Sequence, residues 1–177
     1  MAQILQTIDE LELFFADLIV AMTGLNEKAV LIQYQSQGQP SSKIGEDVVY
    51  VKVTPEPDER GLYKNRKKVY NSDSEKFTFS QQSSRTLTLH VVFYGPHCYE
   101  LCTMMNEKFY FNDYQVQMRQ NYLSIVPDRT NGPIRLPEQH NGQWWQRCDI
   151  ELRFYNTVAI EETVSTFKEF DIRTEVN

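Results

Sequence analysis

The sequence has few of the residues that common reaction centres require. Its 177 residues include three histidines and seven glycines, and the glycines mark turns instead of forming a nucleotide loop. No Ser-His-Asp or Cys-His arrangement is apparent, and the phosphate-loop, dinucleotide and zinc-protease motifs are missing. We therefore expect no enzymatic activity, no catalytic residues and no cofactor.

Cysteine is scarce and odd in number. Cys98, Cys102 and Cys148 cannot form a fully paired framework, which predicts free thiols and assembly in a reducing cytoplasm. Cys98 and Cys102 share one helical face and could bind zinc with His97 or Cys148, but the spacing fits no zinc knuckle. Because free cysteine is commonly a small buried residue, we expect no metal.

Long hydrophobic runs and an excess of positive charge are also missing. The apolar run at 11–22 is short and is interrupted by Glu12 and Asp17, and no basic region precedes it. We therefore expect neither a signal peptide nor a membrane span. The balance of 18 basic against 24 acidic residues gives a net charge of -6. This balance opposes general phosphate binding, so nucleic acid is not the default partner.

Two segments alternate in the way that strands do. Leu87, Leu89, Val91 and Phe93 alternate with more polar residues, and Gly95 and Pro96 then end the strand. The segment 144–156 alternates in the same way, with Cys148, Ile150, Leu152 and Phe154 on one face. This pattern predicts antiparallel, half-exposed strands.

Helical spacing marks two principal helices. One covers 8–22, with Thr7 or Asp9 as its cap and Gly24 as its stop, and the other covers 98–109. Further strands are predicted at 29–35, 48–54, 69–80 and 123–126, the third running by a short turn into the central strand. The segment 112–122 could be a short helix or a strand, and we favour a helix because Asn112 or Asp113 could cap it.

These elements predict one α+β domain over 1–177. Its mainly antiparallel sheet would carry the two principal helices on one face, with long polar loops. Leu89, Val91, Ile150 and Leu152 should share a core with Leu18 and Leu101.

Two long polar segments, at about 55–68 and 127–143, and a C-terminal extension at about 157–177 complete the chain. Loops longer than about 12–15 residues are uncommon in compact domains unless they are functional or disordered. We expect both segments to contact neighbouring subunits or other proteins. Their basic residues are Arg60, Lys64, Arg66, Lys67, Lys68, Arg129 and Arg135.

The basic segment at 60–70 has two interpretations. Its lysines and arginines, flanked by Tyr63 and Tyr70, could contact phosphate and stack on bases. Alternatively, the segment is a solvated arm or docks on an acidic neighbour. We favour these latter interpretations, because acidic residues near the C-terminus offer a counterpart and opposite patches suit head-to-tail rings. These acidic residues are Glu161, Glu162, Glu169, Asp171 and Glu175.

Trp144 and Trp145 are a further candidate for an interface. One of them could be an interface anchor while the other faces the core, and burial of both in the core is the alternative.

The order of these elements, with HVVFYGPHCYELCTMM and QWWQRCDIELRFYN, resembles the neck or tail terminator (tail-completion) proteins of tailed bacteriophages. The resemblance implies a small α+β protein that forms a ring, typically hexameric, at the head-proximal end of the tail tube. Such a ring stops tube growth and offers a surface for head-tail joining.

The same resemblance implies partners and a location. The partners would be the tail tube protein, the head-tail connector or a head-completion protein, and the tail sheath where one is present. DNA would pass through the channel without specific binding. The protein would be assembled in the host bacterial cytoplasm and end in the virion tail or neck. Another tail, baseplate or head-completion component is the alternative, followed by a nucleic-acid-binding module.

Overall fold

The computed structural model describes residues 3–4, 6–33, 43, 45–57, 59–72, 76–127, 132–140 and 142–165. The helices within these ranges are α1 (Ile8–Thr23), η1 (Glu27–Ala29), η2 (Glu59–Leu62), α2 (Cys98–Lys108) and α3 (Asn112–Gln120). The strands are β1 (Gln3–Ile4), β2 (Val30–Ile32), β3 (Val48–Pro55), β4 (Asn65–Asn71), β5 (Lys76–Tyr94), β6 (Leu123–Ile125), β7 (Ile134–Arg135), β8 (Glu138–His140), β9 (Gln143–Trp145) and β10 (Arg147–Ser165).

One mixed sheet organises the chain. Its main path is β1-β10-β5-β3-β2, with β4 beside β5 and with β6 and β7 beside β10, while β8 and β9 form a separate hairpin. Among the described strands, β2 and β3 pair in parallel and the other pairs are antiparallel. The predicted α+β class with a mainly antiparallel sheet is confirmed.

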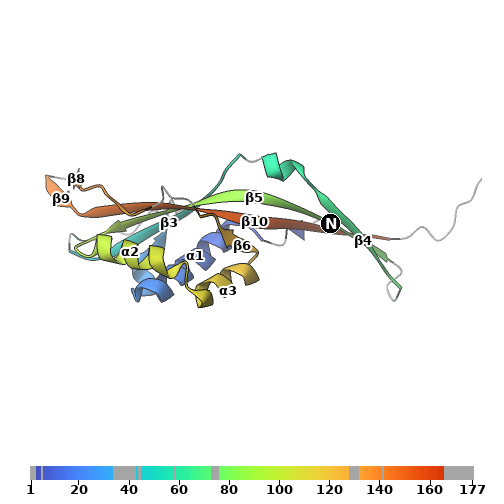
Figure 1. The fold of residues 1–177 in the computed structure, drawn as a ribbon, viewed down its shortest axis with the longest axis horizontal. Coiled ribbons are helices and arrows are strands. Elements are labelled where there is room, and N and C mark those ends of the chain that lie inside the picture. The colour runs from blue at the N-terminus through green and yellow to red at the C-terminus, as the bar shows by residue number, and fades with distance from the viewer. Residues whose placement is uncertain are drawn as a thin grey trace, which may run out of the picture.

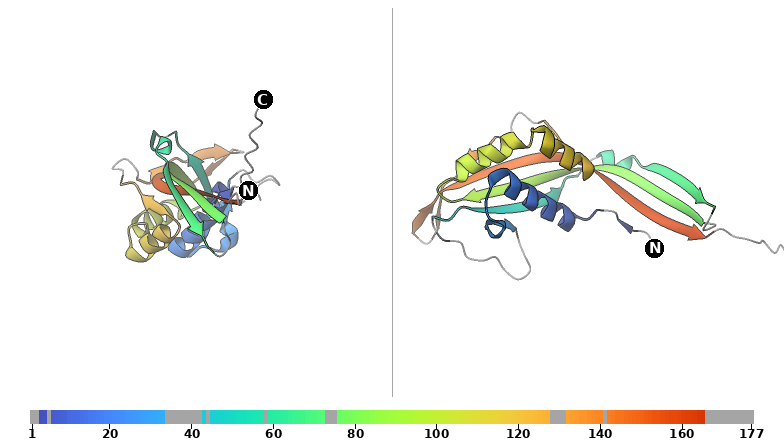
Figure 2. Two further views of the ribbon diagram at one scale, coloured as in Figure 1. Left: turned by 90° about the vertical axis from the view of Figure 1, so that its right-hand side faces the viewer. Right: turned by 90° about the horizontal axis from the view of Figure 1, so that it is seen from below.

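The longest pairing joins β5 to β10. The two strands stay in register from Tyr94 and Arg147 at one end to Lys76 and Ser165 at the other. The helices cover only part of this pair, and Figures 1 and 2 show the remainder extending beyond them together with β4. We call this extension the arm and define it as residues 65–71, 76–84 and 157–165.

The structure corrects several expectations about these strands. No turn separates residues 76–80 from the central strand, because β5 is continuous. The late strand does not end at 156, since β10 continues to Ser165 through the expected extension. The segments expected as loops contain β4, β7 and β8. Backbone pairing supplies the physical reason, since polar strands are ordered by a neighbour's ladder as well as by burial.

The helices begin and end largely where the sequence indicates. Thr7 caps α1 in a reciprocal capping box with Glu10, and Gly24 ends it in the left-handed conformation. The helix predicted at 112–122 is α3, but Phe111 occupies its cap position and has no side-chain oxygen to accept a capping hydrogen bond. Neither Asn112 nor Asp113 is therefore the cap.

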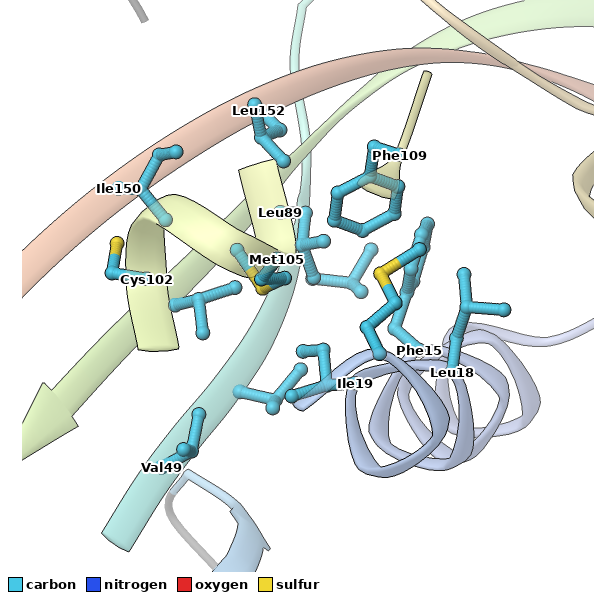
Figure 3. Close-up of a cluster of buried hydrophobic side chains, with 14 of the residues drawn as sticks. Phe15, Leu18, Ile19, Val49, Leu89, Cys102, Met105, Phe109, Ile150 and Leu152 are labelled. Carbon is cyan, nitrogen blue, oxygen red and sulfur yellow. The ribbon is translucent and has the colours of Figure 1, made fainter. Parts of the chain in front are cut away.

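The core lies between the helices and one face of the sheet. Phe15, Leu18 and Ile19 of α1 meet Met105 of α2 over Leu89 and Leu152, as Figure 3 shows. Val91 and Ile150 belong to the same cluster, whereas Leu101 is only partly buried against it. The predicted core faces are thus confirmed, with Leu101 at the margin.

A tight corner joins β5 to α2. Gly95 has φ of 117°, and a Cβ there would lie 2.4 Å from Oδ1 of Asp47. The same oxygen accepts a hydrogen bond of 3.0 Å from the His97 backbone, and Oδ2 lies 2.8 Å from His97 Nδ1. Asp47 therefore holds the start of α2 against β3, and only glycine fits beside it.

Polar side chains mark the point where the core gives way to the arm. Asn156, which is 1% exposed, accepts a 2.9 Å hydrogen bond from Arg85 Nε. Its amide donates to Gln6 Oε1 and to the Tyr122 carbonyl, at 3.1 and 3.3 Å. These bonds tie both long strands to the ends of the helical layer, which fixes where the arm leaves the body.

Leu152→Ala should lower the free energy of unfolding by about 2–5 kcal/mol, because it leaves a cavity between the sheet and α2. Leu136→Ala, at a position that is 46% exposed, is the matched control and should change it by less than about 0.5 kcal/mol. Denaturant titration measures both. A loss under about 1 kcal/mol for Leu152→Ala would show that the core is assigned to the wrong face.

Asp47→Asn should lower the pKa of His97. The hydrogen bond that His97 donates to Asp47, together with the negative charge of Asp47, raises that pKa above the ordinary histidine value. The folded-state pKa exceeds the unfolded one, so the stabilisation is complete below about pH 6.5 and is lost as pH rises through the folded value. NMR titration of the imidazole protons measures the shift, with Glu46→Gln as the control. An unchanged His97 pKa in Asp47→Asn contradicts the assignment.

Candidate assembly surfaces

The arm carries five of the ten predicted interface residues, namely Arg66, Lys67, Lys68, Glu161 and Glu162. Lys64 precedes β4, and Arg66, Lys67 and Lys68 lie on it, all of them exposed. The side chain of Arg60 and all of Arg129 lie outside the described residues. Glu161 and Glu162 belong to β10 and lie one strand away from β4, with Glu162 opposite Phe79 and Phe79 opposite Lys68.

This placement removes part of the acidic patch that was expected to receive the basic segment of a neighbouring subunit. Glu161 and Glu162 lie within the arm and do not form an acidic patch apart from the basic one. The expected counterpart at Glu169, Asp171 and Glu175 lies outside the described residues. An acidic surface for the arm must therefore be sought elsewhere in the described part of the chain.

Alternation divides the arm into two different faces. Residues of β5 with odd numbers point to the same side as the core residues Leu87 and Leu89, and β10 residues with even numbers share that side. We call this the helix-side face of the arm. It carries Arg66, Lys68, Tyr70, Phe77, Phe79, Gln81, Ser83, Val158, Ile160, Glu162 and Val164.

The helix-side face is apolar at its centre, and none of the helices that the structure describes lies over it (Figure 2). Tyr70 and Phe77 pack with ring centroids 4.9 Å apart, and Phe79 lies 6.4 Å from Phe77. The Lys68 ammonium lies 4.0 Å from the Phe77 centroid and 5.1 Å from that of Phe79. Tyr70 is nevertheless 52% exposed and Phe79 41%.

The opposite face of the arm is mainly polar. Its described residues include Lys67, Thr78, Ser80, Gln82, Glu161 and Thr163, together with Val69, which is 47% exposed. Charged side chains on an edge strand hinder its pairing with another chain, so the charges of β4 could serve only to protect this edge. That role does not account for exposed aromatic residues on one face only. Exposed aromatic clusters of this kind mark interaction sites.

The second surface is the tip at the other end of the molecule, formed by residues 134–136 and the β8–β9 hairpin (Figure 1). Trp144 is 66% exposed, Ile134 is 56% exposed and Leu136 is 46% exposed. Arg135 donates to Gln146 Oε1 at 3.2 Å and lies 5.8 Å from the Tyr99 ring centroid. Burial of both tryptophans in the core is therefore wrong.

Arg147 fixes the hairpin to the body. Its guanidinium contacts Glu138 at 2.7 Å and Asp149 at 2.6 Å, and these contacts raise its pKa further above the ordinary value. Tyr94 donates to Glu138 at 2.8 Å and meets the Trp145 ring edge-on, with centroids 6.2 Å apart. Burial and the bond to Glu138 raise the pKa of Tyr94 to about 12. These contacts leave Trp144 pointing outward from a fixed support.

The cysteines and histidines do not form a reaction centre in the described part of the chain. Cys98, Cys102 and Cys148 are free and buried, and burial raises the pKa of the Cys102 thiol. His90 pairs with Glu151 on the far face of the sheet, and His97 with Asp47. Within the described residues no group of three possible ligands is placed to hold a metal. None of the described helices has the length and apolar character to cross a membrane.

Sequence reasoning missed an acidic surface on α1. This helix carries Asp9, Glu10, Glu12 and Asp17 and has no basic residue. Its signal was visible in the sequence, because positions 9, 13, 17 and 21 follow the four-residue spacing of one helical stripe. That stripe is exposed, and it includes Leu13.

Comparison with known proteins gives one family. A family model described as phage neck terminator protein matches residues 8–177. No curated protein matches the chain.

Proposed function

The chain belongs to the phage neck terminator protein family, and from this membership we propose that it forms a ring at the head-proximal end of the tail tube. It is a structural phage protein of the tail and neck. In the proposal, the ring is a hexamer that ends tube polymerisation and provides the attachment surface for the head-tail connector.

The shape of the subunit supports a ring. Its two candidate surfaces, the arm and the tip, lie at opposite ends of an elongated chain (Figure 1). The arm at one end can contact an unlike surface on a neighbouring copy, and contacts between unlike surfaces close into rings when the rotation between subunits permits closure. The tip at the other end is then left for contact with other virion proteins. The whole chain, 1–177, would act as one domain in that assembly.

The tip supports contact with other virion proteins. A largely exposed tryptophan on a fixed hairpin has the character of a binding hot spot. We assign Trp144 and Arg135 to a contact with the tail tube protein or with the connector or head-completion protein. A sheath, where the phage has one, would meet the outside of the ring. The protein would assemble in the host bacterial cytoplasm. DNA would then pass through the channel of the ring without specific binding.

Alternation on β4 weakens the nucleic-acid interpretation. Arg66 and Lys68 lie on the helix-side face, whereas Lys67 lies on the polar face. A backbone track would need these charges on one surface. Salt-dependent DNA binding that is lost in Lys67→Glu, Lys68→Glu would restore that interpretation. A role as another tail, baseplate or head-completion component would keep the same surfaces but change their partners.

A stop codon early in this gene should leave the phage with filled heads and with tail tubes of uncontrolled length that do not join. Electron microscopy of the lysate measures both features, and growth in a suppressor host is the control. The purified chain should sediment at six times its 20.8 kDa mass. Tubes of normal length joined to heads in the mutant, or a purified chain that remains monomeric at high concentration, would contradict the proposal.

A further inference from the structure

We propose that the helix-side face of the arm of one copy covers the outward stripe of α1 in a second copy. The stripe consists of Asp9, Leu13, Asp17 and Ala21. This inference rests on the proposed ring and names the two surfaces that meet in it.

The arm lacks a cover of its own within the described structure. The helices end near the Arg85–Asn156 bond, while the paired strands continue to Lys76 and Ser165. Beyond that bond, Tyr70, Phe79 and Val164 remain 52%, 41% and 40% exposed on the side where the helices would otherwise pack. The face is therefore a continuation of the core surface that the same copy leaves open.

Its charge makes α1 a better partner for the basic arm of a second copy than α2 or α3. Each of α2 and α3 has a basic residue in its last turn, whereas α1 has four acidic residues and no basic one. Glu10 is engaged in the capping box, and Glu12 accepts a 3.0 Å hydrogen bond from the Val53 backbone. Asp9 and Asp17 are exposed and are left facing outward.

Leu13 supplies an apolar centre between the two carboxylates. It is 57% exposed and occupies the position midway between Asp9 and Asp17. On the arm, Arg66 and Lys68 both lie on β4 at one side of the aromatic cluster, and the Lys68 ammonium lies over the rings of Phe77 and Phe79. Both surfaces therefore contain exposed apolar side chains. The arm face carries two basic residues, Arg66 and Lys68, against one acidic residue, Glu162, whereas the α1 stripe carries two carboxylates, so the two surfaces are opposite in net charge.

The dimensions of the two surfaces agree. The part of β5 in the arm, residues 76–84, spans about 27 Å, and α1 with its 16 residues spans about 24 Å. Asp9 and Asp17 are about 12 Å apart along the helix, and Arg66 and Lys68 about 7 Å apart along the strand. Their long side chains cover the difference, so one strand can lie along one helix.

Two charge-reversed chains test this contact. The first, Arg66→Glu with Lys68→Glu, places an acidic arm against an acidic helix. The second, Asp9→Lys with Asp17→Lys, places a basic helix against a basic arm. Each chain alone should therefore lose the assembled mass. In an equal mixture every arm can meet a helix of opposite charge if the two chains alternate, so the mixture should regain it.

The measurement is the sedimentation mass of each full-length chain, of the mixture and of Lys67→Glu, which reverses a charge on the polar face and should assemble normally. Circular dichroism melting checks that each variant is folded. Normal assembly of either variant alone, or a mixture of folded variants that stays dissociated, overturns the inference while leaving the ring in place. A wild-type chain that does not assemble overturns the proposed ring and this contact together.

Discussion

The structure depends on the uninterrupted antiparallel pairing of β5 with β10. The same ladder crosses two environments, because its first part lies under the helices and its second part extends beyond them. Within the body, burial of Leu89 and Leu152 fixes the register, since a slip of one residue would turn the apolar set to the far face. In the arm, backbone bonds carry that register onward through side chains that are largely polar. The core thus determines which side chains the arm presents, and on which side.

The parts of the fold that burial dictates could be predicted from the sequence. Alternation marked Leu87 to Phe93 and Cys148 to Phe154, and helical spacing with Thr7 and Gly24 marked α1. Only part of the arm was found in this way: the strand predicted at 69–80 falls on two antiparallel strands, β4 and β5. Its continuity with the central strand was missed, because QQSS at 81–84 has the composition of a turn and strands without a buried face lack a clear period. The absence of two residue types did indicate that these strands could be long. Neither 76–94 nor 147–165 contains glycine or proline, so nothing in these segments stops a strand.

The sequence identified several residues of the candidate surfaces, but it did not show on which faces these residues lie. The basic cluster and Trp144 were identified, but their faces depend on pairing partners that are distant in sequence. Lys67 and Lys68 are neighbours in the chain and lie on opposite sides of the arm. Glu161 and Glu162, expected as a separate acidic patch, lie on β10 in the same arm, with β5 between them and the basic strand. The exposed carboxylates of α1 were passed over because the helix was assessed for its buried stripe.

Membership of the phage neck terminator family gives these features a context. A subunit of the proposed ring needs a surface that a neighbouring copy completes. Here the body has its own core, while the arm continues one face of that core, and no described helix covers that face. A cryo-EM map of the assembled particle is the most direct test of this account. It should show Tyr70, Phe77 and Phe79 of each arm covered by the next copy, and arms that project into solvent with these rings exposed would contradict it.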